Sequence, residues 1–441
     1  MCMPKTRTEI IEAAKKWACS SSDDEPHIFW LYAMAGEGKT SIATSVAHAL
    51  HEKKVLGGSF FFSRDDANRA RVDNVFATLV LQLIDHMPKF AEPAKDWVQG
   101  KKYELDSSAL SQFQLLEELL QKSDIINGPI IFVLDALDEC MFGQNQREIL
   151  LKCLVKISHL SSSCRFFLTS RQEADIENKL SEAKSQLHPV DLRAFAKDAG
   201  ETTTRDLKEY IKKELQTLPG TLENSDWPGQ DYRQQLLDRT SGLFIWAFTA
   251  INFIKLGNYK EQLNLLLKKS TLQSSLYNLY RTVMDSAYPY KDSFTKEKHY
   301  ILGAIILLQE PLSAASIGML LHIHTEPEES ISQTVNTAMG QLKSVLEIPQ
   351  VDNLAIHILH PSFAEFLTAK EQLEEIYYIN QESHHLNLAI NCLQVMQELL
   401  HYNICKLRDS TKLNKEINEL DQQVKEHIPV YLKYACQFWA E

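Results

Sequence analysis

The stretch IFWLYAMAGEGKTSIATSVAHAL, residues 28–50, constrains the fold more than any other part of the chain. A short apolar and aromatic run leads into a glycine-containing loop, and a helical pattern follows the loop directly. The loop approaches the pattern G-x-x-x-x-G-K-[ST], in which backbone amides wrap a phosphate, the lysine reaches the β and γ oxygens, and the hydroxyl residue holds Mg²⁺. The stretch therefore predicts a buried parallel strand, a phosphate loop and a helix.

The residues predicted to bind phosphate follow from that pattern. Gly38, Lys39 and Thr40 occupy its last three positions, and Ala33 stands where the pattern has its first glycine. Alanine adds only a methyl group, which is tolerated if the backbone there does not need a positive φ. Thr40 is also a predicted Mg²⁺ ligand. The alternative is a chance glycine-lysine turn at a helix start, which does not account for the preceding strand. The predicted nucleotide contacts are Ala35, Gly36, Glu37, Gly38, Lys39, Thr40 and Ser41.

An acidic strand end supplies the second predicted part of the site. The stretch PIIFVLDALDE, residues 129–139, is typical of a buried strand, and it carries Asp135, Asp138 and Glu139 at its end. In phosphate-loop proteins one acid after a hydrophobic strand holds Mg²⁺, and Asp135 sits in that place. Asp138 and Glu139 are predicted to orient or deprotonate the attacking water. Taken alone, these carboxylates also fit a solvated loop or a helix start, where Asp is favoured.

Three further side chains are candidates for sensing the phosphate. Arg171 follows the predicted strand CRFFLTS, and ligands of doubly wound sheets sit beyond the C-terminal ends of the strands. An arginine there can touch a γ-phosphate, with a surface role as the alternative. Arg64 has a similar position after the predicted strand SFFFS. His360 precedes Pro361, which is predicted to begin a helix, and composition alone fits a packed or surface histidine.

The secondary structure predicted from the sequence changes at about residue 190. Up to that point short strands alternate with helices, which predicts a parallel sheet with helical crossovers and hence an α/β fold. Beyond it the pattern is helical, with one further strand predicted in NLAIHILHP, residues 353–361. The sequence therefore predicts a nucleotide-binding α/β part followed by helical parts.

Composition excludes some classes of function. The net charge of −12 argues against a protein that binds nucleic acid, because such binding rests on Lys and Arg. Eight cysteines without a C-x-x-C pair indicate reduced thiols in a cytoplasmic protein. We find no signal peptide, and the longest apolar runs, 243–254 and 301–308, are too short to span a bilayer. We therefore expect no transmembrane segment.

Together these motifs resemble the NACHT family of STAND ATPases, which contains animal Nod-like receptors and fungal incompatibility proteins, and the fungal branch is the most similar. The stretch IFWLYAMAGEGKTSIATSVA resembles its P-loop, FVLDALDEC its Walker B strand and RFFLTSR its sensor strand. LHPSFAEFL is similar to its winged-helix signature. The P-loop half also resembles the nephrocystin-like N-terminal P-loop group.

The resemblance implies a switch. ADP would lock a closed form, and exchange for ATP would open it into an oligomer that acts on protein signalling partners. Arg171 would be the sensor arginine, and His360 would contact the ADP phosphate. The implied parts are a lead-in helix (1–25), a P-loop NACHT domain (26–190), a helical domain (191–290), a winged-helix domain (291–375) and a second helical segment (376–441).

Other interpretations stay open at this point. The sequence shows neither an N-terminal effector domain nor a C-terminal repeat array, so we expect either a stand-alone switch core or a fragment of a longer repeat-containing protein. A conventional NTPase whose turnover performs work is disfavoured, because neither a second catalytic motif nor a basic channel is present. A nucleotide-free helical scaffold is supported only by Ala33. The preference for adenine over guanine rests on the resemblance alone.

Overall fold

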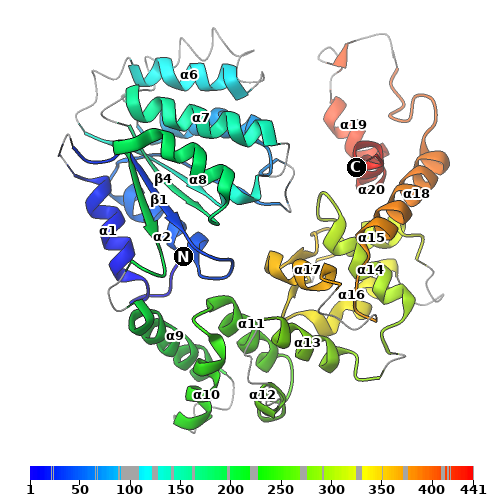
Figure 1. Ribbon diagram of the computed structural model, residues 1–441. Coiled ribbons are helices and arrows are strands. Elements are labelled where there is room, and N and C mark those ends of the chain that lie inside the picture. The colour runs from blue at the N-terminus through cyan, green and yellow to red at the C-terminus, as the bar shows by residue number, and fades with distance from the viewer. Residues whose placement is uncertain are drawn as a thin grey trace. The chain divides into compact units, whose positions relative to one another are not determined.

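The chain divides into two compact units, Met1–Ala247 and Phe248–Glu441 (Figure 1). The computed structural model describes residues 1–440 apart from 21, 23, 65, 67, 88–89, 91–108, 122–127, 141–143, 161–163, 196–198, 219–226, 269–275, 291–292, 324–329, 350, 371–375, 409–412, 415–416 and 418.

The first unit is built on a five-stranded parallel sheet with the strand order β2-β3-β4-β1-β5. The predicted α/β P-loop fold is thereby confirmed, and β4 lies between the strand that enters the phosphate loop and the strand that ends in acids. Parallel pairing brings the C-terminal ends of β1, β3 and β4 to one edge of the sheet. The strands are β1 (Ile28–Tyr32), β2 (Leu56–Phe61), β3 (Ile130–Asp135), β4 (Cys164–Ser170) and β5 (Leu187–Asp191).

Four of these strands were predicted, and β5 was not. Its sequence, LHPVD, contains Pro189 and buries only Val190, so it lacks the apolar run that marks the other strands. A proline fits here because β5 pairs on one side only, with β1, and an edge strand can do without one backbone donor.

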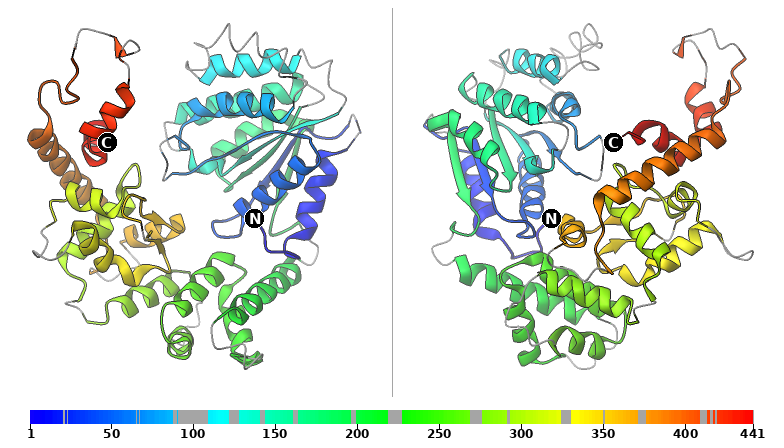
Figure 2. Two further views of the ribbon diagram at one scale, coloured as in Figure 1. Left: turned by 180° about the vertical axis from the view of Figure 1, so that it is seen from behind. Right: turned by 45° about the vertical axis from the view of Figure 1, so that its right-hand side comes forward.

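Helices cover both faces of the sheet (Figures 1 and 2). Alternate residues of β1 enter different cores: Ile28 and Trp30 pack with α3, α6, α7 and α8, whereas Phe29 and Leu31 pack with α1 and α2. Burial on both faces explains why the predicted strands read as continuous apolar runs. These helices are α1 (Thr8–Ala18), α2 (Lys39–Glu52), α3 (Val75–His86), α6 (Ala109–Gln121), α7 (Gln144–Leu160) and α8 (Ala174–Leu180), with 3₁₀ turns at Val72–Asn74, Leu137–Glu139 and Ser181–Gln186.

The remaining part of the first unit is helical, as predicted beyond residue 190. It contains α9 (Ala199–Gln216) and α10 (Gln230–Thr240), and α11 (Phe244–Lys255) begins in it. Ser241 and Gly242 both have positive φ, and they separate α10 from α11.

The second unit is mostly helical with one small antiparallel ladder, β6 (Leu346–Glu347) with β7 (His357–Ile358). The strand predicted over residues 353–361 is therefore much shorter than expected, while the helix predicted to begin at Pro361 is confirmed as α17 (Pro361–Thr368). The predicted domain boundary at residue 375 lies outside the described residues. The other helices are α12 (Tyr259–Lys268), α13 (Leu276–Ala287), α14 (Lys296–Leu307), α15 (Ala314–Leu320), α16 (Ile331–Met339), α18 (Gln381–Leu399), α19 (Leu420–His427) and α20 (Val430–Phe438), with a 3₁₀ turn at Gly340–Leu342.

Two further expectations concern the whole chain. All eight cysteines are free thiols. Among the described residues, we find no helix with the length and apolar character needed to cross a membrane.

Candidate functional site

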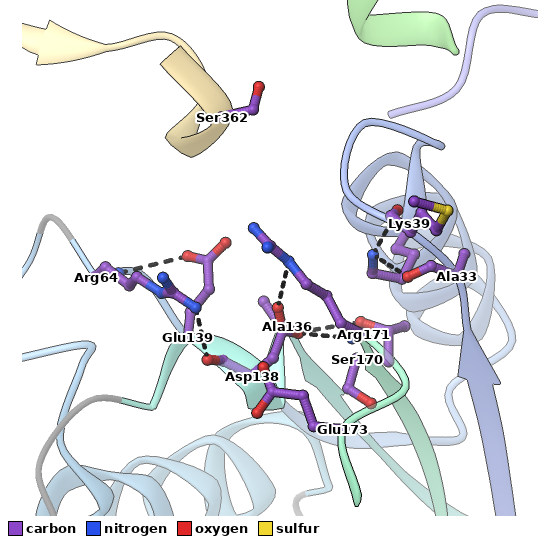
Figure 3. Close-up of polar contacts among 12 residues, drawn as sticks. Ala33, Lys39, Arg64, Ala136, Asp138, Glu139, Ser170, Arg171, Glu173 and Ser362 are labelled. Atoms are coloured by element: carbon purple, nitrogen blue, oxygen red, sulfur yellow. Dashed lines mark hydrogen bonds and ion pairs between the residues drawn. The ribbon is translucent and has the colours of Figure 1, made fainter. Parts of the chain in front are cut away.

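The predicted phosphate loop joins β1 to α2 at the carboxyl edge of the sheet (Figure 3). Gly36 and Gly38 have φ values of 79° and 91°, a left-handed conformation that glycine adopts without strain. The Lys39 ammonium donates to the carbonyls of Ala33 and Met34 at 2.8 and 2.9 Å, so the lysine closes the loop over its own backbone. Ala33 is not among the residues of positive φ, so the condition for tolerating an alanine there is met.

The buried side chain of Glu37 stabilises the loop. Its side chain is only 6% exposed, one carboxylate oxygen pairs with Arg193, and the other accepts the backbone amide of Met34 at 3.2 Å. The guanidinium of Arg7 donates to the Glu37 carbonyl at 3.0 Å. Any contact of Glu37 with a phosphate would therefore come from its backbone amide.

The loop also touches the start of α11. The Ile245 amide donates to the Gly36 carbonyl at 3.1 Å. A Cβ on Gly36 would lie 2.1 Å from Cγ2 of Ile245, so only glycine fits between them. Thr40 is exposed at the first turn of α2, and the Ser41 carbonyl accepts the hydroxyl of Ser45 at 2.8 Å.

The two predicted Mg²⁺ ligands, Asp135 and Thr40, lie close together. Asp135 is 1% exposed at the end of β3, its carboxylate accepts a hydrogen bond from the hydroxyl of Thr169, and the Thr40 hydroxyl lies near enough to lower its pKa. The Thr169 hydroxyl in turn accepts the Ala136 amide at 3.0 Å. Burial raises the pKa of Asp135, and the two hydroxyls and nearby Lys39 oppose that rise.

This donor set fits Mg²⁺. The ion prefers oxygen ligands and is usually held by one or two carboxylates together with substrate phosphates and water. A threonine hydroxyl and a buried carboxylate beside a phosphate loop match that chemistry. Among the described residues no group of three or more His, Cys, Asp or Glu side chains is placed to hold a metal.

Asp138 and Arg171 form a second cluster at the same edge (Figure 3). Asp138 is 5% exposed, and one of its carboxylate oxygens lies 3.1 Å from Nε of Arg171. It follows Ala136, whose φ of 61° turns the chain back over the end of β3. A non-glycine residue in this region stores strain, which is typical of functional sites.

Glu139 lies beside Asp138 and has an unusual pKa. Burial, together with the Asp138 charge, raises the pKa of Glu139 from 4.5 to about 7, while Arg64 acts in the opposite direction. The Arg64 amide lies 3.4 Å from the Glu139 carboxylate, and its guanidinium donates to the Asp138 carbonyl at 3.1 Å. A carboxylate that titrates near neutrality can serve as a general base.

His360 belongs to the second unit and begins α17. Its Nδ1 accepts the Ser362 amide at 3.2 Å and lies 2.6 Å from the Ser362 hydroxyl, which in turn contacts the Tyr280 hydroxyl at 2.8 Å. The histidine therefore caps a helix, with Nδ1 as the acceptor. The expected contact of His360 with a phosphate stays a prediction.

A cavity of about 530 Å³ adjoins the phosphate loop at Glu37. Polar groups from α9 and from the turn between α10 and α11 face it. Its lining includes Arg7, Glu37, Arg193, Thr203, Asp238 and Gly242.

Sequence reasoning missed four of these participants. Thr169, Arg7, Arg193 and Ile245 each act through partners that are distant in the chain, and none lies in a local motif. Only Thr169 gave a usable signal, since it sits beside the predicted Arg171 at the end of a strand.

Residues 5–171 match the protein family described as Nephrocystin 3, N-terminal. The matched range contains the phosphate loop and the acidic end of β3, and it ends at Arg171. No curated protein matches the chain in sequence.

Solved structures give weaker likenesses. The Orc1 protein of Aeropyrum pernix in complex with DNA is 12% identical, with a TM-score of 0.37 and coverage of 82% of this chain and 91% of that one. The Walker-type ATPase paby2304 of Pyrococcus abyssi is 13% identical, with a TM-score of 0.36 and coverage of 82% and 98%. The Drosophila ORC bound to DNA is 9% identical, with a TM-score of 0.35 and coverage of 83% and 88%. The assignment of this chain to the P-loop NTPase fold therefore rests on its own parallel sheet, its phosphate loop and the acidic end of β3.

Proposed function

We propose that this protein is a nucleotide-dependent signalling switch of the NACHT type, which binds ATP and ADP with Mg²⁺ and hydrolyses ATP slowly. The observation that carries the proposal is the meeting of Lys39, Thr40 and Asp135 at one edge of the sheet. A phosphate loop, a hydroxyl–carboxylate pair and an acidic cluster at that edge are the parts that phosphoryl transfer needs.

In this proposal, different residues of the first unit have different roles in binding and hydrolysis. Lys39 and the loop amides would bind the phosphates, and Thr40 with Asp135 would hold Mg²⁺, which neutralises phosphate charge when bound. Glu139, with its pKa near 7, would accept a proton from the attacking water. Arg171 would exchange its contact with Asp138 for one with the γ-phosphate, and in this way report the triphosphate.

His360 is proposed to sense the diphosphate. Because Nδ1 accepts the Ser362 amide hydrogen, a neutral His360 carries its proton on Nε2, which can donate to a phosphate oxygen. The assignment of this role rests on the resemblance of LHPSFAEFL to a winged-helix signature.

The wider role is proposed from the same resemblance. We propose four further properties on this basis: self-association on activation, protein signalling partners, a cytoplasmic location and a place in fungal incompatibility signalling. The cavity beside Glu37 supports a nucleotide over a free phosphate, because a base and ribose need such a space next to the loop.

The test is to purify the protein, denature it and identify any nucleotide that is released. We expect stoichiometric ADP from the wild type and none from Lys39→Ala. The matched control is Lys53→Ala, which removes an exposed lysine at the other end of the same helix and should leave the bound nucleotide unchanged. A wild-type protein that carries no nucleotide and fails to bind added Mg-ATP would overturn the proposal.

A further inference from the structure

We propose that Arg7 is a positioning residue that orients the phosphate-binding amides of the loop and couples them to the helical segment that follows the sheet. The inference rests on the proposed nucleotide binding and adds a control element to it. Arg7 lies just before α1, 30 residues from Glu37, and it carries no recognisable motif.

The planar geometry of the peptide bond relates the Arg7 contact to the orientation of the phosphate-binding amides. In a trans peptide, the carbonyl of one residue and the amide of the next point to opposite sides. Arg7 holds the carbonyl of Glu37 at 3.0 Å, and the Ile245 amide holds the carbonyl of Gly36 at 3.1 Å. The amides of Glu37 and Gly38 are therefore turned away from these two anchors. Consecutive amides fixed on one side of a glycine loop form the concave nest that binds phosphate.

Arg7 is itself held tightly. Its guanidinium donates to the Thr203 hydroxyl at 3.1 Å and lies 4.9 Å from the centre of the Phe244 ring. Its backbone amide donates to the buried Asp206 carboxylate at 2.8 Å. Thr203 and Asp206 belong to α9, and Phe244 begins α11, so Arg7 connects both of these helices to the loop.

The backbone of Arg7 supports a functional role. Its φ of 54° is left-handed, which is costly for a residue with a side chain, and its side chain makes no cap for α1. Strain of this kind persists only where surrounding contacts fix the conformation. Here those contacts converge on Glu37, whose carboxylate is fixed separately by Arg193.

The experiment compares Arg7→Met with Arg165→Met. Arg165 is a matched control because it is also a buried arginine of the first unit and also donates to backbone carbonyls, but those of Trp17 and Ala18. We would measure the Kd for Mg-ADP and for inorganic pyrophosphate, the melting temperature, and amide hydrogen exchange of residues 34–38 without nucleotide.

We expect Arg7→Met to raise both Kd values by about tenfold or more, because a charge-assisted contact to the loop is lost. Exchange at residues 34–38 should become faster. Arg165→Met should lower the melting temperature while leaving both Kd values within about twofold. Arg7→Lys should restore part of the affinity, since it keeps the charge but cannot serve both partners. Thr203→Val, which removes only the hydroxyl beside the guanidinium, is the milder variant if Arg7→Met does not fold.

Unchanged Kd values and exchange rates in a folded Arg7→Met protein would overturn the proposal, as would an equal effect of Arg165→Met. If the wild type binds neither Mg-ADP nor pyrophosphate, the proposed nucleotide function fails. The exchange rates then still decide whether Arg7 positions the loop, because that measurement needs no ligand.

Discussion

Asp138 holds Arg171 at two points: one carboxylate oxygen accepts the Arg171 backbone amide at 2.9 Å, and the other lies 3.1 Å from Nε of the same residue. The pair joins the acidic turn after β3 to the end of β4. Since Asp138 is almost fully buried and Arg171 only partly so, the carboxylate fixes the arginine rather than the reverse. A γ-phosphate that recruits Arg171 would have to replace this contact.

Asp138→Asn tests that relationship. The amide oxygen can still accept the Arg171 backbone amide, but the ion pair with Nε is lost. We expect the rate of ATP hydrolysis to fall by about 10²-fold with a change in Kd of less than about threefold, because positioning affects the reaction more than binding. Single-turnover hydrolysis and nucleotide titration measure the two quantities. Asp175→Asn, which breaks the ion pair of an exposed acid with Arg147, should leave both unchanged.

The pKa of Glu139 predicts a pH profile. A general base must be deprotonated, so with a pKa of about 7 the hydrolysis rate should rise about tenfold between pH 6 and pH 8. Arg64→Met should move the midpoint to higher pH, because Arg64 lowers the pKa of Glu139. A rate that is flat over this range, or a midpoint that falls in Arg64→Met, would exclude Glu139 as the base.

The two loop glycines should differ in their tolerance of alanine. Both have positive φ, so either substitution introduces backbone strain of about 1–2 kcal/mol. At Gly38 a Cβ meets nothing within 4 Å, whereas at Gly36 it overlaps Ile245. Gly36→Ala should therefore lower the free energy of unfolding more than Gly38→Ala, as measured by urea denaturation. In Gly36→Ala/Ile245→Ala the overlap is removed, so the two effects should not add. Equal losses in the two glycine variants would contradict this account.

The parts of the site that the sequence predicted are those carried by local motifs. Lys39 and Thr40 follow a glycine pattern, and Asp135 ends an apolar run, so each can be recognised from its immediate neighbours. Arg193 could not be predicted in this way, because its partner Glu37 lies 156 residues away in the chain. The strand β5 was missed for a related reason: its place at the sheet edge removes the need for an apolar run, and only tertiary pairing with β1 defines it.

Thr169 offers a test of the predicted Mg²⁺ site. Thr169→Val keeps the shape of a fully buried side chain but removes the hydroxyl that Asp135 and the Ala136 amide share. The free energy of unfolding should fall by about 1–3 kcal/mol, because buried polar groups lose a partner. The pKa of Asp135 should rise further, since the hydroxyl lowers it, and Mg-ADP affinity should fall, because a protonated carboxyl group is a poor Mg²⁺ ligand. Thr44→Val is the control, as its hydroxyl bonds only to its own helix, at the Thr40 carbonyl. Equal Mg-ADP affinity in Thr169→Val and Thr44→Val would show that Thr169 does not support the site.

The second unit contains a histidine whose burial predicts sensitivity to acid. His384, on α18, is 6% exposed, and neither ring nitrogen has a hydrogen-bond partner within the described part of the chain. Its ring occupies the space that a side chain at Gly303 would need, and the His299 ring lies 5.0 Å away. Burial first, and then the charges of His299 and His385, lowers the pKa of His384 from 6.5 to about 4.

Between pH 6.5 and pH 4 the unfolded chain therefore binds a proton at His384 that the folded chain does not, and stability must fall as the pH decreases through this range. We expect the loss to be of the order of 1–3 kcal/mol. His384→Leu should flatten the dependence of the melting temperature on pH over this interval, because an apolar side chain of similar size does not titrate. His385→Leu, at the neighbouring and more exposed position, should retain the dependence. A wild-type melting temperature that is constant from pH 6.5 to pH 4, or a His384→Leu profile parallel to that of the wild type, would show that this ring is not buried in its neutral form.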